Sequence, residues 1–268
     1  MTTPKRYAVI DGAIEEGVTD FLAQEKAPSC CLYADPIQPE LITLAPYLVE
    51  VTPGVEAWLA MRETPWGLFI TSGLSLQKLQ QHLRFFLWVT IPDQDKPVLF
   101  RFYDPRNIGA LLEVLTGRER QLFTFPLLKI TAMLNGISQE FDFSPQVTDT
   151  STAEGENKEV SPLRFTRRQY EKLNLQAQTN YLHELAGFIK QIITDSTISV
   201  SHLAEEYFLF CQAHDITDDN SVRQMIRLLL NENIHDTQDI PDNWLEVLGD
   251  TAQPGYRRVQ ELTTDKGL

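Results

Sequence analysis

The sequence predicts an α/β N-terminal lobe with a mixed sheet, followed by a smaller all-α C-terminal lobe. In residues 1–143, short runs rich in Val, Ile, Phe and Tyr alternate with amphipathic segments. From residue 163 onward, apolar residues recur every three or four positions, which is typical of helices. Between these regions, residues 144–162 contain no aromatic residue and few apolar ones. We therefore expect two domains, 1–143 and 163–268, joined by an acidic flexible linker at 144–162.

The first lobe contains alternating candidate strands and helices. The strands are expected at residues 7–10, 30–33, 47–51, 68–71, 85–91, 98–103 and 127–133. The helices are expected at about 15–24, 55–61, 75–84 and 105–115. Ser75 and Asp104 are the expected N-caps of the last two helices, and Pro105 suits a first helical position. The Pro-bounded segment 92–97 predicts a hairpin connection, so we expect a mixed sheet and not an all-parallel one.

The second lobe is expected to contain helices and no strands. Thr166 can cap a long helix that runs to about residue 193. Further helices are expected at about 200–214, 221–231 and 244–248, and Asp219 or Asn220 would cap the second of these.

The charge balance disfavours two classes of partner. Lys and Arg total 23 against 37 Asp and Glu, which gives a formal net charge of −14. Residues 1–143 carry 12 basic and 17 acidic side chains (net −5), and residues 144–268 carry 11 and 20 (net −9). Neither half is a basic module, and negative charge repels phosphate backbones and anionic lipids. We therefore expect no nucleic-acid partner and no membrane-surface partner.

Cysteine usage and hydropathy predict a cytoplasmic protein. The three cysteines, Cys30, Cys31 and Cys211, do not form a disulfide framework and are typical of a reducing compartment. No signal peptide is visible, and no apolar run approaches the roughly 20 residues of a membrane span. We expect no membrane insertion.

Enzyme signatures are missing from the sequence. It has no GxGxxG, GxxxxGK[ST], HExxH, GxSxG or CxxC pattern, so we expect no catalytic residue, no cofactor and no bound metal. Asp93 and Asp95 form a DxD pair, which holds a metal in some transferases, but their position beside Lys96 in a Pro-bounded turn favours a solvated turn. Cys30 and Cys31 are neighbours on one expected strand and would point to opposite faces, which favours packing over a redox pair.

The segment FRFYDPR, residues 100–106, is the densest group of unusual residues. As a strand, it would place Phe100 and Phe102 on one face and Arg101 and Tyr103 on the other. In a functional interpretation, Arg101, Asp104 and Arg106 form a polar site at the end of a strand. In the structural interpretation, which we favour, Asp104 caps a helix and pairs with an Arg. No general base, nucleophile or metal cluster accompanies them.

Several elements occur in an order that resembles a known family. They are YAVIDGA (7–13), LY (32–33), LAPYLV (44–49), WG (66–67), HLR (82–84) and FRFYDPR (100–106). Over about residues 6–130 the sequence is similar to the type VI secretion effector chaperones, an adaptor family long known only as a domain of unknown function. The family supplies no catalytic residues to carry over.

The resemblance implies a non-catalytic cytoplasmic adaptor of Gram-negative bacteria. Such a chaperone binds one secreted effector and helps load it onto the valine-glycine-repeat spike protein, which is a second candidate partner. For the helical lobe we consider an effector groove lined by Tyr181, Phe188, Tyr207 and Phe208, against the alternative that these aromatic residues close the lobe's own core. The alternative functions are a metal- or nucleotide-dependent enzyme that uses Arg101 and Asp104, and an acidic immunity protein.

Overall fold

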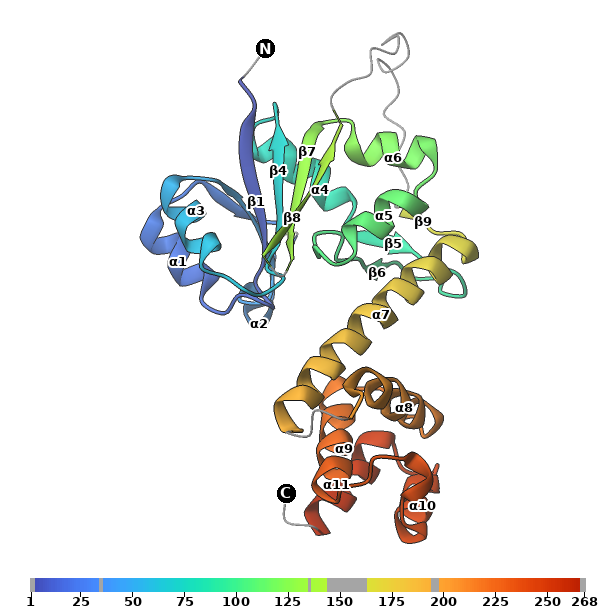
Figure 1. The fold of residues 1–268 in the computed structure, drawn as a ribbon. Coiled ribbons are helices and arrows are strands. Elements are labelled where there is room, and N and C mark those ends of the chain that lie inside the picture. The colour runs from blue at the N-terminus through green and yellow to red at the C-terminus, as the bar shows by residue number, and fades with distance from the viewer. Residues whose placement is uncertain (1–2, 34–35, 135, 144–162, 194–197, 266–268) are drawn as a thin grey trace. The chain divides into compact units, whose positions relative to one another are not determined.

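The computed structural model describes residues 3–33, 36–134, 136–143, 163–193 and 198–265 (Figure 1). Two compact units make up the chain: unit 1, Met1–Gln176, and unit 2, Ala177–Leu268. The predicted linker at 144–162 lies outside the described residues. The helical unit begins at residue 177 and not at 163, because residues 163–176 contribute to unit 1.

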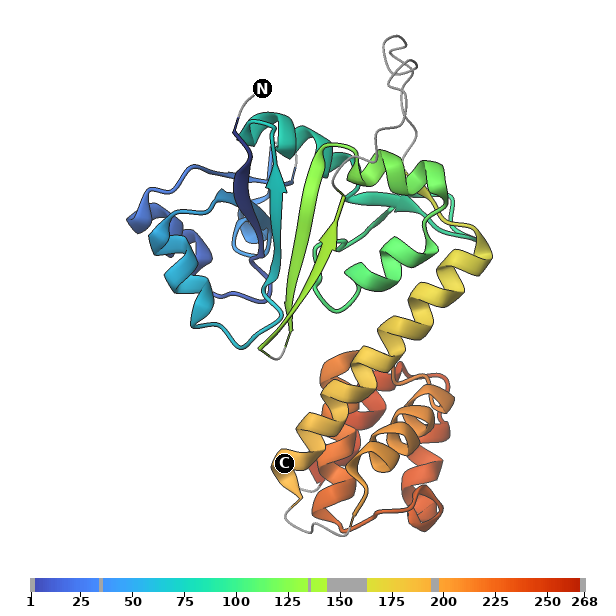
Figure 2. The ribbon, with the colours of Figure 1, turned by 45° about the horizontal axis from the view of Figure 1, so that its top comes forward.

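A six-stranded sheet forms the centre of unit 1. Its strand order is β2-β3-β1-β4-β7-β8, and all neighbouring strands are antiparallel. The strands are β1 (Lys5–Asp11), β2 (Ser29–Cys31), β3 (Pro46–Glu50), β4 (Gly67–Ser72), β7 (Leu127–Leu134) and β8 (Ile137–Asp142). Figure 2 shows β1, β4, β7 and β8 side by side. The sequence predicted all of these except β8, whose mostly exposed residues lack an apolar pattern.

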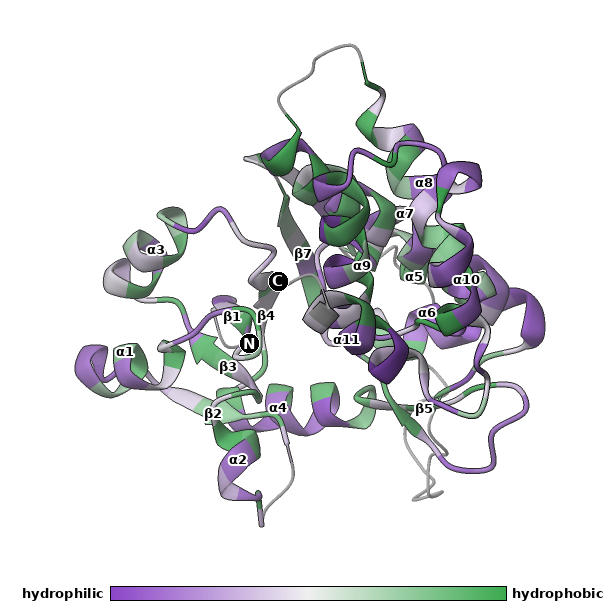
Figure 3. Cartoon of the chain, turned by 90° about the horizontal axis from the view of Figure 1, so that it is seen from below, coloured by the Kyte–Doolittle hydropathy of each residue, from purple (hydrophilic) through white to green (hydrophobic). Residues whose placement is uncertain are grey.

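Helices cover both faces of this sheet. Because successive strand residues point to opposite faces, Tyr7 and Val9 of β1 enter one core while Ala8 and Ile10 enter the other. The second core packs against α1 (Val18–Glu25) and α3 (Pro53–Ala60), and the first against α4 (Leu76–Phe85). In Figure 3, α1 and α3 lie on one side of β1 and β3, and α4 lies on the other. Burial of both faces makes β1 the central strand of the α/β unit.

A second, three-stranded sheet completes unit 1 and is mixed. Its strands are β5 (Trp88–Thr90), β6 (Val98–Leu99) and β9 (Leu163–Arg164), in the order β6-β5-β9. The β5–β6 pair is antiparallel, which confirms the hairpin predicted at 92–97, and β9 is parallel to β5. The prediction that residues 163–268 contain no strand was therefore wrong. Leu163 and Phe165 are buried in the unit 1 core, which draws this segment onto the α/β unit.

The segment after β6 differs from its prediction. The strand ends at Leu99, and residues 100–107 form a loop of turns before α5 (Ile108–Val114) and α6 (Gly117–Thr124). Asp104 is therefore not the N-cap of the helix; that position is held by Asn107. Two adjacent aromatic side chains, Phe102 and Tyr103, are both buried in the same core, which an alternating strand does not allow.

All regular secondary structure in the described parts of unit 2 is helical. The helical elements are the end of α7 (Arg167–Ile192), α8 (Val200–Ala213), α9 (Asp219–Asn231), a short 3-10 turn η1 (Thr237–Asp239), α10 (Asp242–Gly249) and α11 (Gly255–Asp265). Asp218, and not Asp219 or Asn220, caps α9, because its carboxylate accepts the Ser221 N–H at 2.9 Å. Buried Arg258 donates to the Leu248 carbonyl at the end of α10 and, at 2.7 Å, to the His214 carbonyl after α8. These bonds satisfy carbonyls that helix ends leave open.

Among the described residues, the structure has no helix with both the length and the apolar composition needed to cross a bilayer.

Candidate functional site

The elements that carry the family resemblance meet at the end of β1. Asp11, the last residue of this strand, is 2% exposed. Its N–H donates to the Trp66 carbonyl at 2.8 Å, and its carboxylate accepts the Ala13 N–H at 3.0 Å. The same carboxylate is ion-paired with the Arg101 guanidinium, 90 residues further along the chain. The FRFYDPR loop is thereby attached to the central strand of the sheet.

A second ion pair lies within the loop itself. Asp104 accepts the Arg106 backbone N–H at 2.9 Å, and its two oxygens accept Nε and Nη2 of the same residue at 2.9 and 2.6 Å. Such a bidentate pair fixes both partners in one geometry. Asp104 is buried and the Arg106 side chain is largely covered. The predicted pairing of Asp104 with an Arg is therefore present, and it stabilises a turn in place of a helix cap.

The segment at 31–33 is held against α4 by Arg84. The guanidinium donates to the carbonyls of Cys31, Leu32 and Tyr33 at 3.1, 3.1 and 2.5 Å. The Tyr33 hydroxyl lies close enough to that of Tyr103 for each to shift the pKa of the other. We use the term motif cluster for Asp11, Tyr33, Arg84, Arg101, Tyr103, Asp104 and Arg106.

Burial controls the electrostatics of the motif cluster. It raises the pKa of the Asp11 carboxyl, and the Arg101 guanidinium opposes that shift. Burial also raises the pKa of the Tyr103 hydroxyl, with the Asp11 charge acting in the same direction, so this hydroxyl stays protonated. The carboxylates of Asp11 and Asp104 each have an arginine partner. Chemically, this arrangement can hold a loop in one shape and present arginine at its surface.

The structure brings together four of the six predicted motif residues. Arg101, Tyr103, Asp104 and Arg106 belong to the motif cluster. Phe102 is instead in the core, where it packs edge-on against Phe123 with ring centroids 5.7 Å apart. Phe100 is partly buried against Phe165, with centroids at 5.3 Å.

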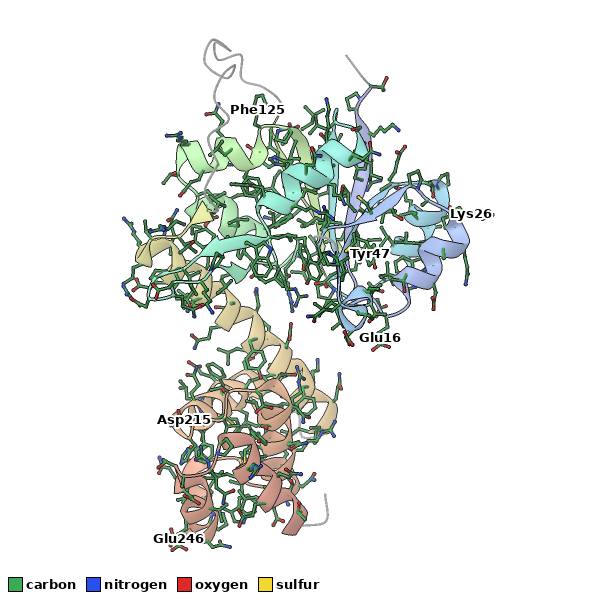
Figure 4. The ribbon with its side chains drawn as sticks, turned by 180° about the vertical axis from the view of Figure 1, so that it is seen from behind. Glu16, Lys26, Tyr47, Phe125, Asp215 and Glu246 are labelled. Atoms are coloured by element: carbon green, nitrogen blue, oxygen red, sulfur yellow. The ribbon has the colours of Figure 1, made fainter. Side chains whose placement is uncertain are left out.

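An exposed aliphatic surface lies beside the motif cluster. Leu41 and Ile42 of α2 (Pro39–Ile42) and Leu44 after it are 40%, 41% and 48% exposed, and we call them the apolar rim. The rim is fixed to the end of β1 because the Gly12 N–H donates to the Ala45 carbonyl at 3.1 Å. A Cβ atom at Gly12 would lie 2.5 Å from two carbonyl oxygens of this segment, so only glycine allows the approach. Tyr47, labelled in Figure 4, adds a hydrogen bond from its hydroxyl to the Ile42 carbonyl at 2.9 Å.

The remaining candidate residues of unit 1 are the DxD pair and the two adjacent cysteines. The exposed side chain of Asp93 pairs with Arg167, and Asp95 is exposed, as a solvated turn predicts. Neither Cys30 nor Cys31 forms a disulfide with another described cysteine, and Cys30 packs against the core. Burial raises the pKa of the Cys30 thiol to about 11, which disfavours its thiolate. Among the described residues, no group of three or more His, Cys, Asp or Glu side chains is placed to hold a metal.

The four residues of the predicted effector groove have different environments in unit 2. Tyr207 is fully buried and donates its hydroxyl to the Ile234 carbonyl at 2.6 Å, so it belongs to the core and not to a groove. Tyr181 and Phe208 are partly buried and pack edge-on, with centroids 5.8 Å apart. Phe188 is partly buried beneath the guanidinium of Arg223. These three side chains contact the core and keep part of their surface exposed.

Sequence reasoning missed the partners of the FRFYDPR loop. Asp11 is the polar residue that ends an apolar strand just before a glycine, and this pattern was the available signal. Arg84 stood out only as part of the HLR element, and its partners could not be predicted because they are backbone carbonyls of residues 31–33, about 50 residues away in the sequence.

Comparison with known proteins gives a match to a protein family over part of the chain. The model of a family described as "Domain of unknown function (DUF4123)" matches residues 6–122. This match includes the whole motif cluster and the apolar rim, and it covers less than half of the 268 residues. The search of curated proteins and the search of solved structures each gave no match. Residues 6–122 are thus similar to a family whose description names no function.

Proposed function

We propose that this protein is a non-catalytic adaptor that binds one type VI secretion effector in the cytoplasm and helps load it onto the spike protein. The observation that carries the proposal is the motif cluster with the apolar rim beside it. The resemblance of residues 6–130 to the effector chaperones supports the same function, and the family match at 6–122 covers the same part of the chain.

The chemistry of the motif cluster suits a binding surface better than a reaction centre. A catalytic site needs a nucleophile or a base in a pocket, with a place for the reacting atom nearby. Here each carboxylate is held by an arginine, and the buried Tyr103 hydroxyl stays protonated. An exposed apolar patch next to arginine is typical of a protein-binding surface, because such patches mark interaction sites and arginine is enriched at interfaces. We therefore propose that the apolar rim and Arg101 contact the effector.

A paired substitution tests this surface. Leu44→Asp places a charge in the apolar rim, and Met61→Asp places the same charge on another exposed apolar residue of unit 1, which is 72% exposed. We expect Leu44→Asp to abolish co-purification with the effector encoded by the neighbouring gene, and Met61→Asp to leave it intact. Equal recovery of the effector with both variants would contradict the assigned surface.

Secretion assays distinguish the adaptor from an immunity protein. Deletion of the gene is expected to stop export of one effector while the other effectors are still secreted. If deletion instead leaves export unchanged and sister cells become poisoned, the adaptor proposal is wrong. A pull-down with the purified spike protein, with and without the effector, tests the loading step.

A further inference from the structure

A small groove in unit 1 lies apart from the motif cluster, between the first turns of α7 and the junction of α5 and α6. Its volume is about 270 Å³. The lining residues are Glu113, Val114, Thr116, Thr166, Arg168, Gln169 and Lys172. We call this feature the basic groove.

The walls of the basic groove are fixed by a network centred on Gln169, which is 7% exposed. Its side-chain oxygen accepts the Thr166 N–H at 2.9 Å, and its amide nitrogen donates to the Val114 carbonyl at 3.0 Å and to Glu119 at 2.9 Å. Glu119 also accepts the Thr116 N–H at 2.8 Å as part of a capping box. The start of α7 is thereby tied to the end of α5 and the start of α6, so the groove is formed before any partner arrives.

The charge around the basic groove is opposite to that of the chain as a whole. Apart from Arg167, which pairs with Asp93, four exposed cations lie on its lining or within two residues of it: Arg118, Arg164, Arg168 and Lys172. In the part of the chain that the structure describes, none of them has an ion-pair partner within 4.0 Å. The nearby carboxylates are Glu113 and Glu171, since Glu119 is used by the Gln169 network. The surface therefore keeps an excess of positive charge in a protein of net charge −14.

One face of α7 extends the basic groove by an apolar contact. Arg168, Lys172 and Leu175 are spaced by four and three residues, which places them on the same side of the helix. Leu175 is 66% exposed. Two cations followed by a leucine form a stripe that matches a helix with two acidic residues and an apolar residue one turn further on.

We infer that the basic groove binds an acidic amphipathic helical segment of a partner protein, with Arg168 and Lys172 pairing its carboxylates and Leu175 contacting its apolar side. A polypeptide fits better than a nucleic acid, because the stripe ends in an aliphatic residue and the rest of the chain is strongly acidic. This inference does not depend on the proposed function, since the groove shares no residue with the motif cluster or the apolar rim.

A labelled peptide tests the inference on the full chain. The probe is a fluorescein-labelled helical peptide of about 20 residues, long enough to form a helix on binding. It has Glu pairs four residues apart and Leu at the next turn, and a second peptide has Gln in place of Glu. By fluorescence anisotropy at low salt, we expect the Glu peptide to bind at least about tenfold more tightly than the Gln peptide, because charge pairing drives recognition.

Charge-reversal variants locate the binding site. The double variant Arg168→Glu with Lys172→Glu is expected to weaken binding of the Glu peptide by about tenfold or more. The matched control is Lys78→Glu with Arg257→Glu, which makes the same change in net charge at two exposed positions in the first turns of α4 and α11. The control is expected to bind within about twofold of the wild type, and Leu175→Ala about threefold more weakly.

Several results would overturn the inference. One is equal affinity of the groove variant and the control variant for the Glu peptide. Another is equal affinity of the wild type for the Glu and Gln peptides. A third is displacement of the peptide by a single-stranded thymidine oligonucleotide of the same charge at lower concentration than by unlabelled peptide, which would assign the groove to nucleic acid. Circular dichroism melting of each variant checks that the fold is retained.

Discussion

The guanidinium of Arg101 is ion-paired with the carboxylate of Asp11, a residue that is almost completely buried at the end of the central strand. Removing the arginine leaves that carboxylate without its main cationic partner. The loop that contains Arg101 has no other described charge pair to the central strand. The stability of unit 1 is therefore coupled to the motif cluster.

A double-mutant cycle measures this coupling. We expect Arg101→Met to lower the free energy of unfolding by about 1–3 kcal/mol, a range reduced by solvent because the arginine side chain is 39% exposed. In the Arg101→Met background, Asp11→Asn should cost much less free energy of unfolding than in the wild type, because the carboxylate that it removes has already lost its cationic partner. Urea unfolding of the four proteins gives the coupling energy. Additive effects would show that the pair does not stabilise the fold.

Gly67 is a second position where substitution should be costly. Its φ is +147°, and an added Cβ would lie 1.9 Å from the Val9 carbonyl oxygen of the neighbouring strand. We expect Gly67→Ala to destabilise the protein by more than about 1 kcal/mol, since both the backbone conformation and the strand spacing would have to change. Gly117→Ala is the control, because no atom lies within 4 Å of its added Cβ. Thermal melting of both variants should separate them clearly.

We expect His82 to make a contribution to stability that is lost in acid. Burial lowers its pKa below the ordinary value of 6.5, and its Nε2 lies 2.9 Å from the Phe123 carbonyl oxygen. Because the unfolded chain takes up the proton first as the pH falls, the contribution of neutral His82 is complete above its unfolded pKa. It is lost progressively as the pH falls from that value towards the folded pKa.

The corresponding measurement compares the wild type with His82→Gln, whose amide can still donate to the carbonyl. Between about pH 7.5 and 5.5, we expect the free energy of unfolding to fall more in the wild type than in the variant. Parallel pH profiles for the two proteins would contradict the assignment.

In unit 2, Tyr256 serves as the control residue for a test of the Tyr207 hydroxyl. Tyr207→Phe removes the hydroxyl that donates to the buried Ile234 carbonyl, so we expect a loss of about 1–2 kcal/mol. Tyr256 is 50% exposed, and Tyr256→Phe should change stability by less than about 0.5 kcal/mol. Chemical denaturation, monitored by circular dichroism, provides the comparison. Similar losses for both variants would argue against a structural role of the Tyr207 hydroxyl.

The sequence was most informative where a segment is rich in buried apolar residues. The apolar runs of β1, β4 and β7 and the helical apolar spacing of α8 and α9 predicted these elements. Edge strand β8 escaped prediction because its residues are mostly exposed. The two-residue strand β9 is too short to show any period.

The site was predicted only in part, for a related reason. The FRFYDPR segment has strand-like composition, but its aromatic residues are buried by a loop that turns between the two sheets. Its arginine was identified as unusual, whereas its partner Asp11 lies 90 residues away, and such a pairing depends on the order of strands in the sheet. Local patterns contain no information on that order. The apolar rim was likewise predicted as part of no helix or strand.

The parallel pairing of β9 with β5 has a consequence for how the chain could be divided. Both Phe143, which donates its N–H to the Leu128 carbonyl, and Leu163 belong to unit 1, so residues 144–162 join two parts of one folded body. A protease site introduced there would cut the covalent chain without separating its products. Buried Phe165 and the Gln169 network should hold the two fragments together through gel filtration. The two fragments, expressed separately and then mixed, should therefore recombine into one folded unit.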